Sequence, residues 1–162
     1  MVNSLILAAA IVVDGLPGKV SVQAPRDILV EAEAFAEKGG WVPDTQFMEQ
    51  MGSPFLLAHG LGQPVADATT AFDAGAGGRR IVYVRTRNWN APWSSHPAGR
   101  FRVSVNGAPL PVTLGTGAAE WMWRRAGEVT LKAGANALAL HDLTGFEGRC
   151  DAIAFSAGER TE

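Results

Sequence analysis

The sequence has 162 residues, of which 47% are hydrophobic and 19% are charged, and this balance excludes a disordered chain. Its formal net charge is −2 and both signs are mixed along the chain, so we expect neither nucleic acid nor a membrane as partner. The single cysteine, Cys150, excludes an intrachain disulfide and a zinc site built from several thiolates. Nineteen glycines and nine prolines indicate many turns, which is typical of a protein made of strands.

The first 26 residues differ from the rest of the chain. Leu5 to Val13 form an apolar run that is too short to span a bilayer but has the length of a signal-peptide core. No Lys or Arg precedes this run, so an extra strand or an ordered N-terminal arm is the alternative. Glycines and prolines then predict a linker over residues 14–26. We therefore expect an N-terminal segment and linker (1–26), one folded module (27–157) and a short tail (158–162).

From Asp27 onward the apolar residues mostly alternate with polar ones, as in strands that have one face in water. Nine short strands separated by turns predict an all-β fold, an antiparallel β-sandwich. Asn106-Gly107 predicts a type I′ hairpin turn, and only Asp44 to Met51 could form a helical turn. The expected strands are Ile28 to Phe35, Phe55 to His59, Ala66 to Phe72, Arg80 to Arg87, Arg100 to Asn106, Leu110 to Leu114, Glu128 to Lys132, Ala135 to His141 and Asp151 to Ser156.

Two glutamates lie two residues apart in the first expected strand. The period of a strand places Glu31 and Glu33 on one face, with roughly 6.6 Å between their α-carbons. Two like charges at this separation become favourable when a hard cation such as calcium lies between them. Asp151 opens the last expected strand, which is often the neighbour of the first strand in a sandwich. The alternative is that both glutamates face water.

The tryptophans suggest where a ligand could bind. Trp89 and Trp93 share one expected loop, whereas Trp121 and Trp123 share one face of a short extended run. Sugar rings stack on flat aromatic side chains, and their hydroxyl groups need a few polar partners. Each tryptophan could instead be a packing residue. The polar candidates beside these tryptophans are Asn88, Asn90 and His96, with Asp142 in a second loop.

Two arginines on another expected strand face have two possible roles. Arg85 and Arg87 could bind an acidic sugar through paired hydrogen bonds. They could also pair with carboxylates across the sheet.

No catalytic signature was found in the chain. It has no Gly-x-Ser-x-Gly elbow, no His-Glu-x-x-His motif, no phosphate loop and no Cys-x-x-Cys pair. Gly115-Thr116-Gly117 lacks the third glycine of a dinucleotide-binding turn, because Glu120 stands in its place. We therefore expect a module without catalytic residues.

Several stretches occur in a characteristic order along the chain. They are Glu31 to Phe35, Gly78 to Arg87, Val105 to Gly107, Leu131 to Leu140 and Asp151 to Ile153. In this order they resemble the carbohydrate-binding modules of the family 6 and family 35 type, which are jelly rolls with a galactose-binding-domain-like fold. This resemblance implies a structural calcium ion held by Glu31, Glu33 and Asp151. It also implies carbohydrate as the partner.

A narrower resemblance rests on polar and aromatic stretches. These are Gly39 to Trp41, Gln50 to Pro54, Arg85 to Trp89, Ala91 to Trp93 and His141 to Asp151. They are similar to the module that precedes an FAD-dependent oxidoreductase domain in secreted proteins of glycan-degrading bacteria. The resemblance implies a secreted, periplasmic or cell-surface location. The leading hypothesis is a glycan-binding module, and the alternative is a structural module that docks on a flavin oxidoreductase domain or a partner subunit.

Overall fold

The computed structural model describes residues 27–91 and 93–160. The apolar run from Leu5 to Val13 and the linker expected over residues 14–26 lie outside this part. None of the described helices has the length and apolar character needed to cross a membrane. The elements are β1 (Ile28–Glu31), the 3₁₀ turn η1 (Ala32–Ala34), β2 (Trp41–Asp44), α1 (Met48–Met51), β3 (Phe55–His59), β4 (Ala68–Asp73), β5 (Gly78–Thr86), β6 (Phe101–Val105), β7 (Ala108–Pro109), β8 (Met122–Leu131), β9 (Ala135–Asp142) and β10 (Phe146–Ser156).

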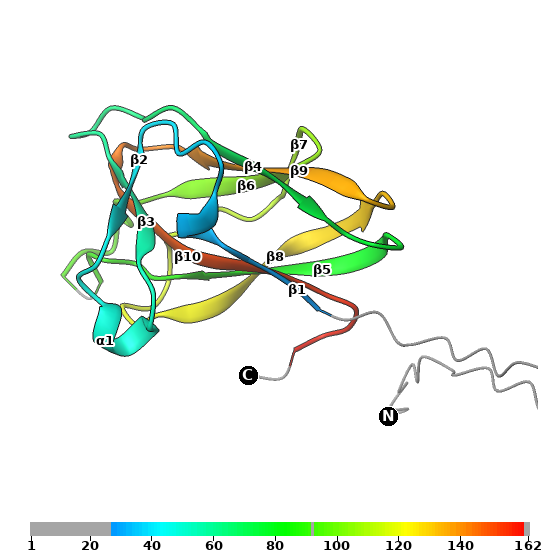
Figure 1. Cartoon of the computed structure of the whole chain (residues 1–162). Helices are drawn as coiled ribbons and strands as arrows, with labels where there is room; N and C mark the ends of the chain where they lie inside the picture. Colours follow the sequence, from blue (N-terminus) through cyan, green and yellow to red (C-terminus); the bar gives the residue numbers. More distant parts are fainter. Residues whose placement is uncertain (1–26, 92, 161–162) are drawn as a thin grey trace, which may run out of the picture.

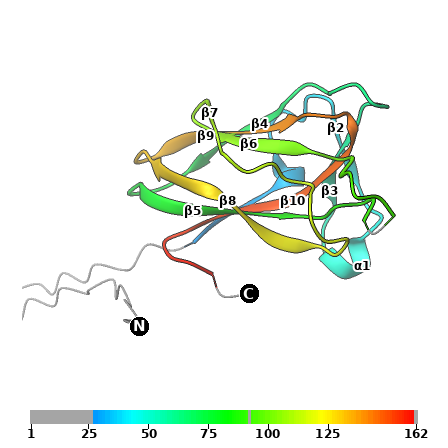
Figure 2. The ribbon, with the colours of Figure 1, turned by 180° about the vertical axis from the view of Figure 1, so that it is seen from behind.

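The strands form two antiparallel sheets that pack face to face, which confirms the predicted sandwich (Figure 1). One sheet has the order β2-β3-β10-β5-β8, with β1 paired to β10 as its sixth strand. The other sheet has the order β4-β9-β6-β7. Seen from behind in Figure 2, the same two layers enclose the core, and α1 lies at one end of the six-stranded sheet.

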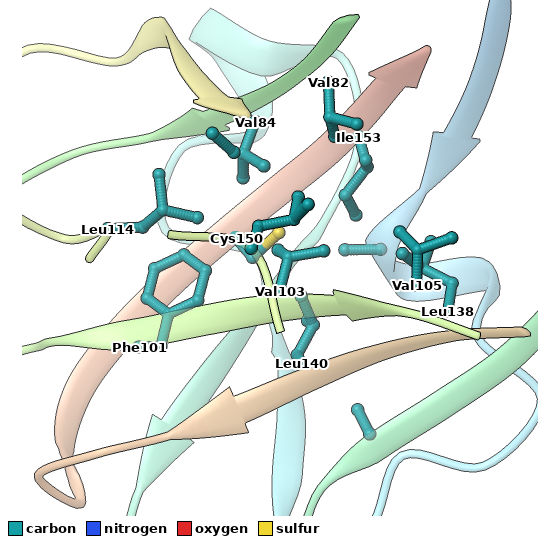
Figure 3. Packing of buried hydrophobic residues seen from close by; sticks show 14 of the residues in the cluster. Val82, Val84, Phe101, Val103, Val105, Leu114, Leu138, Leu140, Cys150 and Ile153 are labelled. Carbon is teal, nitrogen blue, oxygen red and sulfur yellow. The ribbon is translucent and has the colours of Figure 1, made fainter. Parts of the chain in front are cut away.

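Alternating side chains fill the space between the sheets. In β6, Phe101, Val103 and Val105 are buried while Arg102 between them is exposed. Leu138 and Leu140 of β9 alternate in the same way. In Figure 3 these side chains meet those of β5 and β10 between the layers. The alternation of apolar and polar residues in the sequence therefore corresponds to the inner and outer faces of each strand.

The first predicted strand, Ile28 to Phe35, is wrong in its second half. Strand β1 ends at Glu31, and η1 follows, closed by a hydrogen bond from the Phe35 N–H to the Ala32 carbonyl oxygen (3.1 Å). One edge of β10 pairs with β1 at residues 152–155 and with β3 at residues 146–150. Because β3 occupies the rest of that edge, β1 has no partner beyond Glu31.

The prediction also misplaces two other elements. Leu110 to Leu114 form no strand, since Pro111 has no N–H and only Leu114 bridges to Phe101. Strand β2, which contains Pro43, was not predicted, because a short run that includes proline reads as a loop. Proline is tolerated there because β2 is an edge strand.

The remaining strand predictions have the right location, and two of the strands begin five or more residues earlier than expected. Strand β8 begins at Met122 rather than Glu128, and β10 begins at Phe146 rather than Asp151. The predicted hairpin turn is confirmed, because Asn106 and Gly107 have φ values of 51° and 81° and Val105 pairs with Ala108.

Substitution of Phe101 tests the packing between the sheets. Phe101 is fully buried and its ring meets Trp41 edge-on, with 5.5 Å between the centroids. Phe101→Ala is expected to lower the free energy of unfolding by about 3–5 kcal/mol, because it leaves a cavity. The exposed neighbour provides the control: Arg102→Ala should change it by no more than about 0.5 kcal/mol. Urea unfolding measures both, and equal effects would contradict this packing.

Candidate functional site

The long connections between strands meet at one end of the sandwich, opposite the short hairpin turns (Figure 1). Hydrogen bonds join these loops in pairs. The N–H groups of Gly60 and Gly62 donate to the Gly145 carbonyl oxygen, and the Asn88 N–H donates to the Ala118 carbonyl oxygen (2.9 Å). The loops therefore form one connected surface.

Asp142 organises two of these loops from inside. Its buried carboxylate accepts hydrogen bonds from the N–H groups of Val65 (2.9 Å), Gly145 (2.9 Å) and Thr144 (3.2 Å). Gly145 has a φ of 62°, and a β-carbon there would lie 1.9 Å from the Gln63 carbonyl oxygen. The carboxylate of Asp142, which the sequence put forward as a ligand contact, thus already binds three backbone groups.

The loop after β5 carries the first pair of tryptophans. The Trp89 indole N–H donates to the Phe146 carbonyl oxygen (2.9 Å), and the Arg149 guanidinium lies 5.7 Å from the centre of the Trp89 ring. Trp93 is 81% exposed, the highest value among the large hydrophobic side chains of the described residues. Trp89 therefore fixes the loop to β10, while Trp93 is open to a partner.

The polar candidates of this loop are engaged within the loop or with the neighbouring segment. Asn88 is buried, and its amide group donates to the Gly117 carbonyl oxygen (3.4 Å). Asn90 donates to the His96 carbonyl oxygen (2.9 Å) and accepts from the Ala98 N–H (3.2 Å). The His96 ring lies 3.2 Å from the Ser95 hydroxyl oxygen. These side chains therefore shape the loop that carries Trp93.

A cavity of about 390 Å³ lies on the outer face of the six-stranded sheet, between α1 and the segment that leads into β8. Trp121 forms its aromatic wall and packs on Phe55, with 5.0 Å between the ring centroids, and on Phe47, with 5.7 Å. Apart from Ala119, the other side chains that line it are polar or flexible: Gln50, Met51, Arg85, Arg87 and Glu120. One flat indole bordered by hydrogen-bonding groups is a combination that suits a polar ligand with an apolar face.

Within the described part of the chain, Arg87 brings unused donors to this cavity, as does the buried indole N–H of Trp121. The Arg87 guanidinium lies 4.7 Å from the centre of the Phe47 ring and makes no hydrogen bond or ion pair with a described residue. Burial lowers the pKa of Arg87, and the charge of nearby Glu120 opposes this change. Thr86 and Cys150 are paired across β5 and β10, so Arg87 and Arg149 are neighbours of like charge. An oxygen-rich ligand would accept hydrogen bonds from the Arg87 guanidinium and would reduce the repulsion between Arg87 and Arg149.

Beside this cavity lie the three acidic residues of the predicted metal site. Glu31 ends β1, but Glu33 belongs to η1, so the prediction that both glutamates lie on one strand face is wrong. Asp151 is buried, 3.4 Å from the Arg85 guanidinium and 3.5 Å from the Ser53 hydroxyl. No three metal-binding side chains within residues 27–91 and 93–160 are grouped closely enough to hold an ion as they stand.

The three carboxylates nevertheless affect one another. Burial raises the pKa of Asp151 to about 6; the charges of Glu31 and Glu33 add to this rise and Arg85 opposes it. Burial and the charge of Glu33 also raise the pKa of Glu31. One carboxylate oxygen of Glu33 is buried without a hydrogen-bond partner in the described structure. A positive charge among these groups would lower their mutual repulsion.

Trp123 lies on the same sheet face as Trp121, in agreement with their spacing. It packs against Ile81 and Tyr83, and the Arg160 guanidinium lies 5.2 Å from the centre of its ring. The sequence did not single out Phe47, Gln50 or Glu120, because their loops are far apart in the chain and follow no periodic pattern. Arg87 was considered, and its lack of a partner became visible only in the fold.

Comparison with known proteins relates this fold to carbohydrate-binding modules. The sequence matches no family model and no curated protein. Among solved structures, the family 35 module of Cellvibrio japonicus Abf62 is 26% identical, with a TM-score of 0.60 over 82% of this chain and 95% of the module. A family 35 carbohydrate-binding module from Clostridium thermocellum is 20% identical, with a TM-score of 0.61 over 80% of this chain and 98% of the module.

A longer protein also matches. The GH26-CBM35 β-(1,4)-mannanase of Podospora anserina is 18% identical, with a TM-score of 0.65 over 86% of this chain. The match covers only 29% of the mannanase chain. This chain therefore has the β-sandwich fold of carbohydrate-binding modules, which are binding units rather than catalytic domains.

Asp142 provides a test of the loop architecture. Asp142→Ala is expected to lower the free energy of unfolding by about 3 kcal/mol, because three N–H groups lose their acceptor. Asp67→Ala is the matched control; Asp67 binds the exposed His141 ring at 2.8 Å, and its removal should cost about 1 kcal/mol or less. Thermal and urea unfolding measure the difference. Similar effects of the two substitutions would show that Asp142 does not hold the loops.

Proposed function

We propose that this chain is a non-catalytic module that binds carbohydrate at the loop end of its six-stranded sheet. The cavity beside α1 carries the proposal. A sugar ring has an apolar face that stacks on Trp121, and hydroxyl groups that accept hydrogen bonds from Arg87 or donate them to Glu120. The cavity volume of about 390 Å³ falls within the range of small-molecule sites.

The loop after β5 extends this site. Asn88 ties that loop to the segment that forms the cavity wall, through the carbonyl oxygens of Gly117 and Ala118. Exposed Trp93 can therefore contact a sugar outside the cavity, while Trp89, Asn90 and His96 hold the loop in place. This division of roles agrees with loops that bind ligands from a rigid scaffold.

The acidic cluster beside the cavity is proposed as a calcium site. Glu31, Glu33 and Asp151 supply the oxygen ligands that calcium prefers, and the unpartnered oxygen of Glu33 fits such a role. Burial raises the pKa of Asp151 and the charges of Glu31 and Glu33 add to this rise, so a bound cation would favour its ionised form. When bound, the ion would link the end of β1 to β10 and so stabilise the part of the sheet that lies beside the cavity.

The narrower resemblance adds a context for this binding. We expect the module to belong to a secreted protein that also carries a flavin-dependent oxidoreductase domain. Carbohydrate binding by the sandwich would hold that domain close to glycan. Docking of the same aromatic surface on the flavin domain remains the alternative use, and exclusion of Trp93 from solvent in the longer protein would indicate it.

The glycan site is tested by calorimetry with β-1,4-manno-oligosaccharides and laminari-oligosaccharides. Trp121→Ala is expected to weaken binding about tenfold, since it removes the aromatic wall, and Arg87→Met should weaken it by a similar factor. Trp93→Ala should have a smaller effect. The control is Leu61→Ala, which removes an 80% exposed side chain of a neighbouring loop.

Two results would contradict this proposal. If Trp121→Ala folds normally and binds with unchanged affinity, the cavity is not the site. If the wild-type protein binds none of these sugars in the presence of calcium, the proposed function loses its support.

The calcium proposal is tested by thermal unfolding at varied calcium concentration. Binding to the folded state alone should raise the unfolding free energy by about 2.7 kcal/mol at one hundred times the Kd. Asp151→Asn should abolish this gain, whereas Asp67→Asn, which alters an exposed carboxylate outside the cluster, should keep it. A melting temperature that is the same in chelator and in calcium would refute the site.

The pH dependence in chelator has a definite sign. Because the pKa of Asp151 is raised from 3.8 to about 6 in the folded protein, its ionised form destabilises the fold above that pH. This penalty is full above about pH 6, shrinks as the pH falls below that value, and is gone near 3.8, the pKa of the group in the unfolded chain. The unfolding free energy of the wild type should therefore rise relative to that of Asp151→Asn over this range, and a constant difference would contradict the shift.

A further inference from the structure

A second and larger cavity lies farther along the same outer face of the six-stranded sheet. It has a volume of about 640 Å³. Its walls are formed by Asp27, Tyr83, Trp123, Arg125, Ser156, Glu159 and Arg160. It therefore combines two aromatic rings with charged hydrogen-bonding groups, whereas the first cavity has one indole beside such groups.

The two cavities adjoin each other along strands β5 and β8. On β5, Arg87 and Arg85 line the first cavity, and Tyr83, the next residue on that face, lines the second. On β8 and the segment before it, Trp121 lines the first and Trp123 the second. Arg85 and Trp123 are directly paired across the two strands. Neighbouring side chains of the sheet thus connect the cavities without an intervening element.

The C-terminal residues cover part of the second cavity. Glu159 accepts a hydrogen bond from the Tyr83 hydroxyl group (2.6 Å), and its carboxylate lies 3.4 Å from the Arg125 guanidinium. The Arg160 guanidinium lies over the Trp123 ring at 5.2 Å and also binds Asp27 at 3.0 Å. A guanidinium plane on an indole occupies the position that the apolar face of a sugar ring would take.

The geometry points to a track in which the two cavities bind successive parts of one polysaccharide chain, with Arg160 competing for the Trp123 position. This inference rests on the proposed carbohydrate binding and extends it from a short sugar to the interior of a longer chain. Alternating residues of two neighbouring strands give the track its direction along β5 and β8. The second position becomes available when Arg160 leaves the indole.

The test compares affinities for a short and a long sugar: mannobiose with mannohexaose, and laminaribiose with laminarihexaose, by calorimetry. The wild type should bind the hexasaccharide more tightly. Trp123→Ala should weaken hexasaccharide binding about three- to tenfold and leave disaccharide binding unchanged, whereas Trp123→Tyr should retain most of the affinity. Arg160→Ala should tighten hexasaccharide binding, and Arg102→Ala on the opposite sheet should have no effect.

The outcomes separate this inference from the proposed function. The track alone would be overturned if disaccharide binding depends on Trp121 while hexasaccharide binding stays at the wild-type level in both Trp123→Ala and Arg160→Ala. Absence of binding to every sugar would overturn both. If Trp123→Ala does not fold, Arg160→Ala decides the matter: tighter hexasaccharide binding supports the track, and unchanged binding overturns it.

Discussion

Strand β10 is the element on which the rest of the structure depends. One of its edges hydrogen-bonds to β1 and β3 in turn, and its other edge bonds to β5. All its residues from Gly148 to Ser156 are buried. Because β1 and β3 share one edge of β10, β1 ends at Glu31 and the chain pairs with this edge again only as β3. This sharing places Asp151 beside the end of β1, and the pairing of the other edge with β5 places Arg149 beside the end of β5.

The two faces of the six-stranded sheet carry different kinds of side chain. Its inner face supplies apolar side chains such as Val82, Val84 and Ile153 to the core. Its outer face carries arginines, acidic groups and indoles, which α1 and the C-terminal residues cover only in part. Charged groups crowded on a face that is half covered need partners, and the described chain supplies them for Arg85 but not for Arg87. This imbalance is the physical basis for assigning a ligand to the surface.

Alternation of apolar and polar residues predicted the sandwich and most strands, because burial of one face leaves a period of two. Strand ends were harder to predict. The end of β1 depends on β3, which is distant in sequence, and β2 contains Pro43. For the site, alternation was enough to place Trp121 and Trp123 on one face. The approach of Arg87 to Phe47 depends on the packing of separate loops, which no local pattern contains.

The most direct test of the account is a nuclear magnetic resonance titration that follows the five indole N–H signals as an oligosaccharide is added. Trp41 is 2% exposed and belongs to the core, so its signal is an internal reference. The account predicts that the Trp121 signal shifts with saturation while the Trp41 signal stays in place. Saturable sugar binding that leaves the Trp121 signal unmoved would contradict the central claim that the outer face of the six-stranded sheet binds carbohydrate.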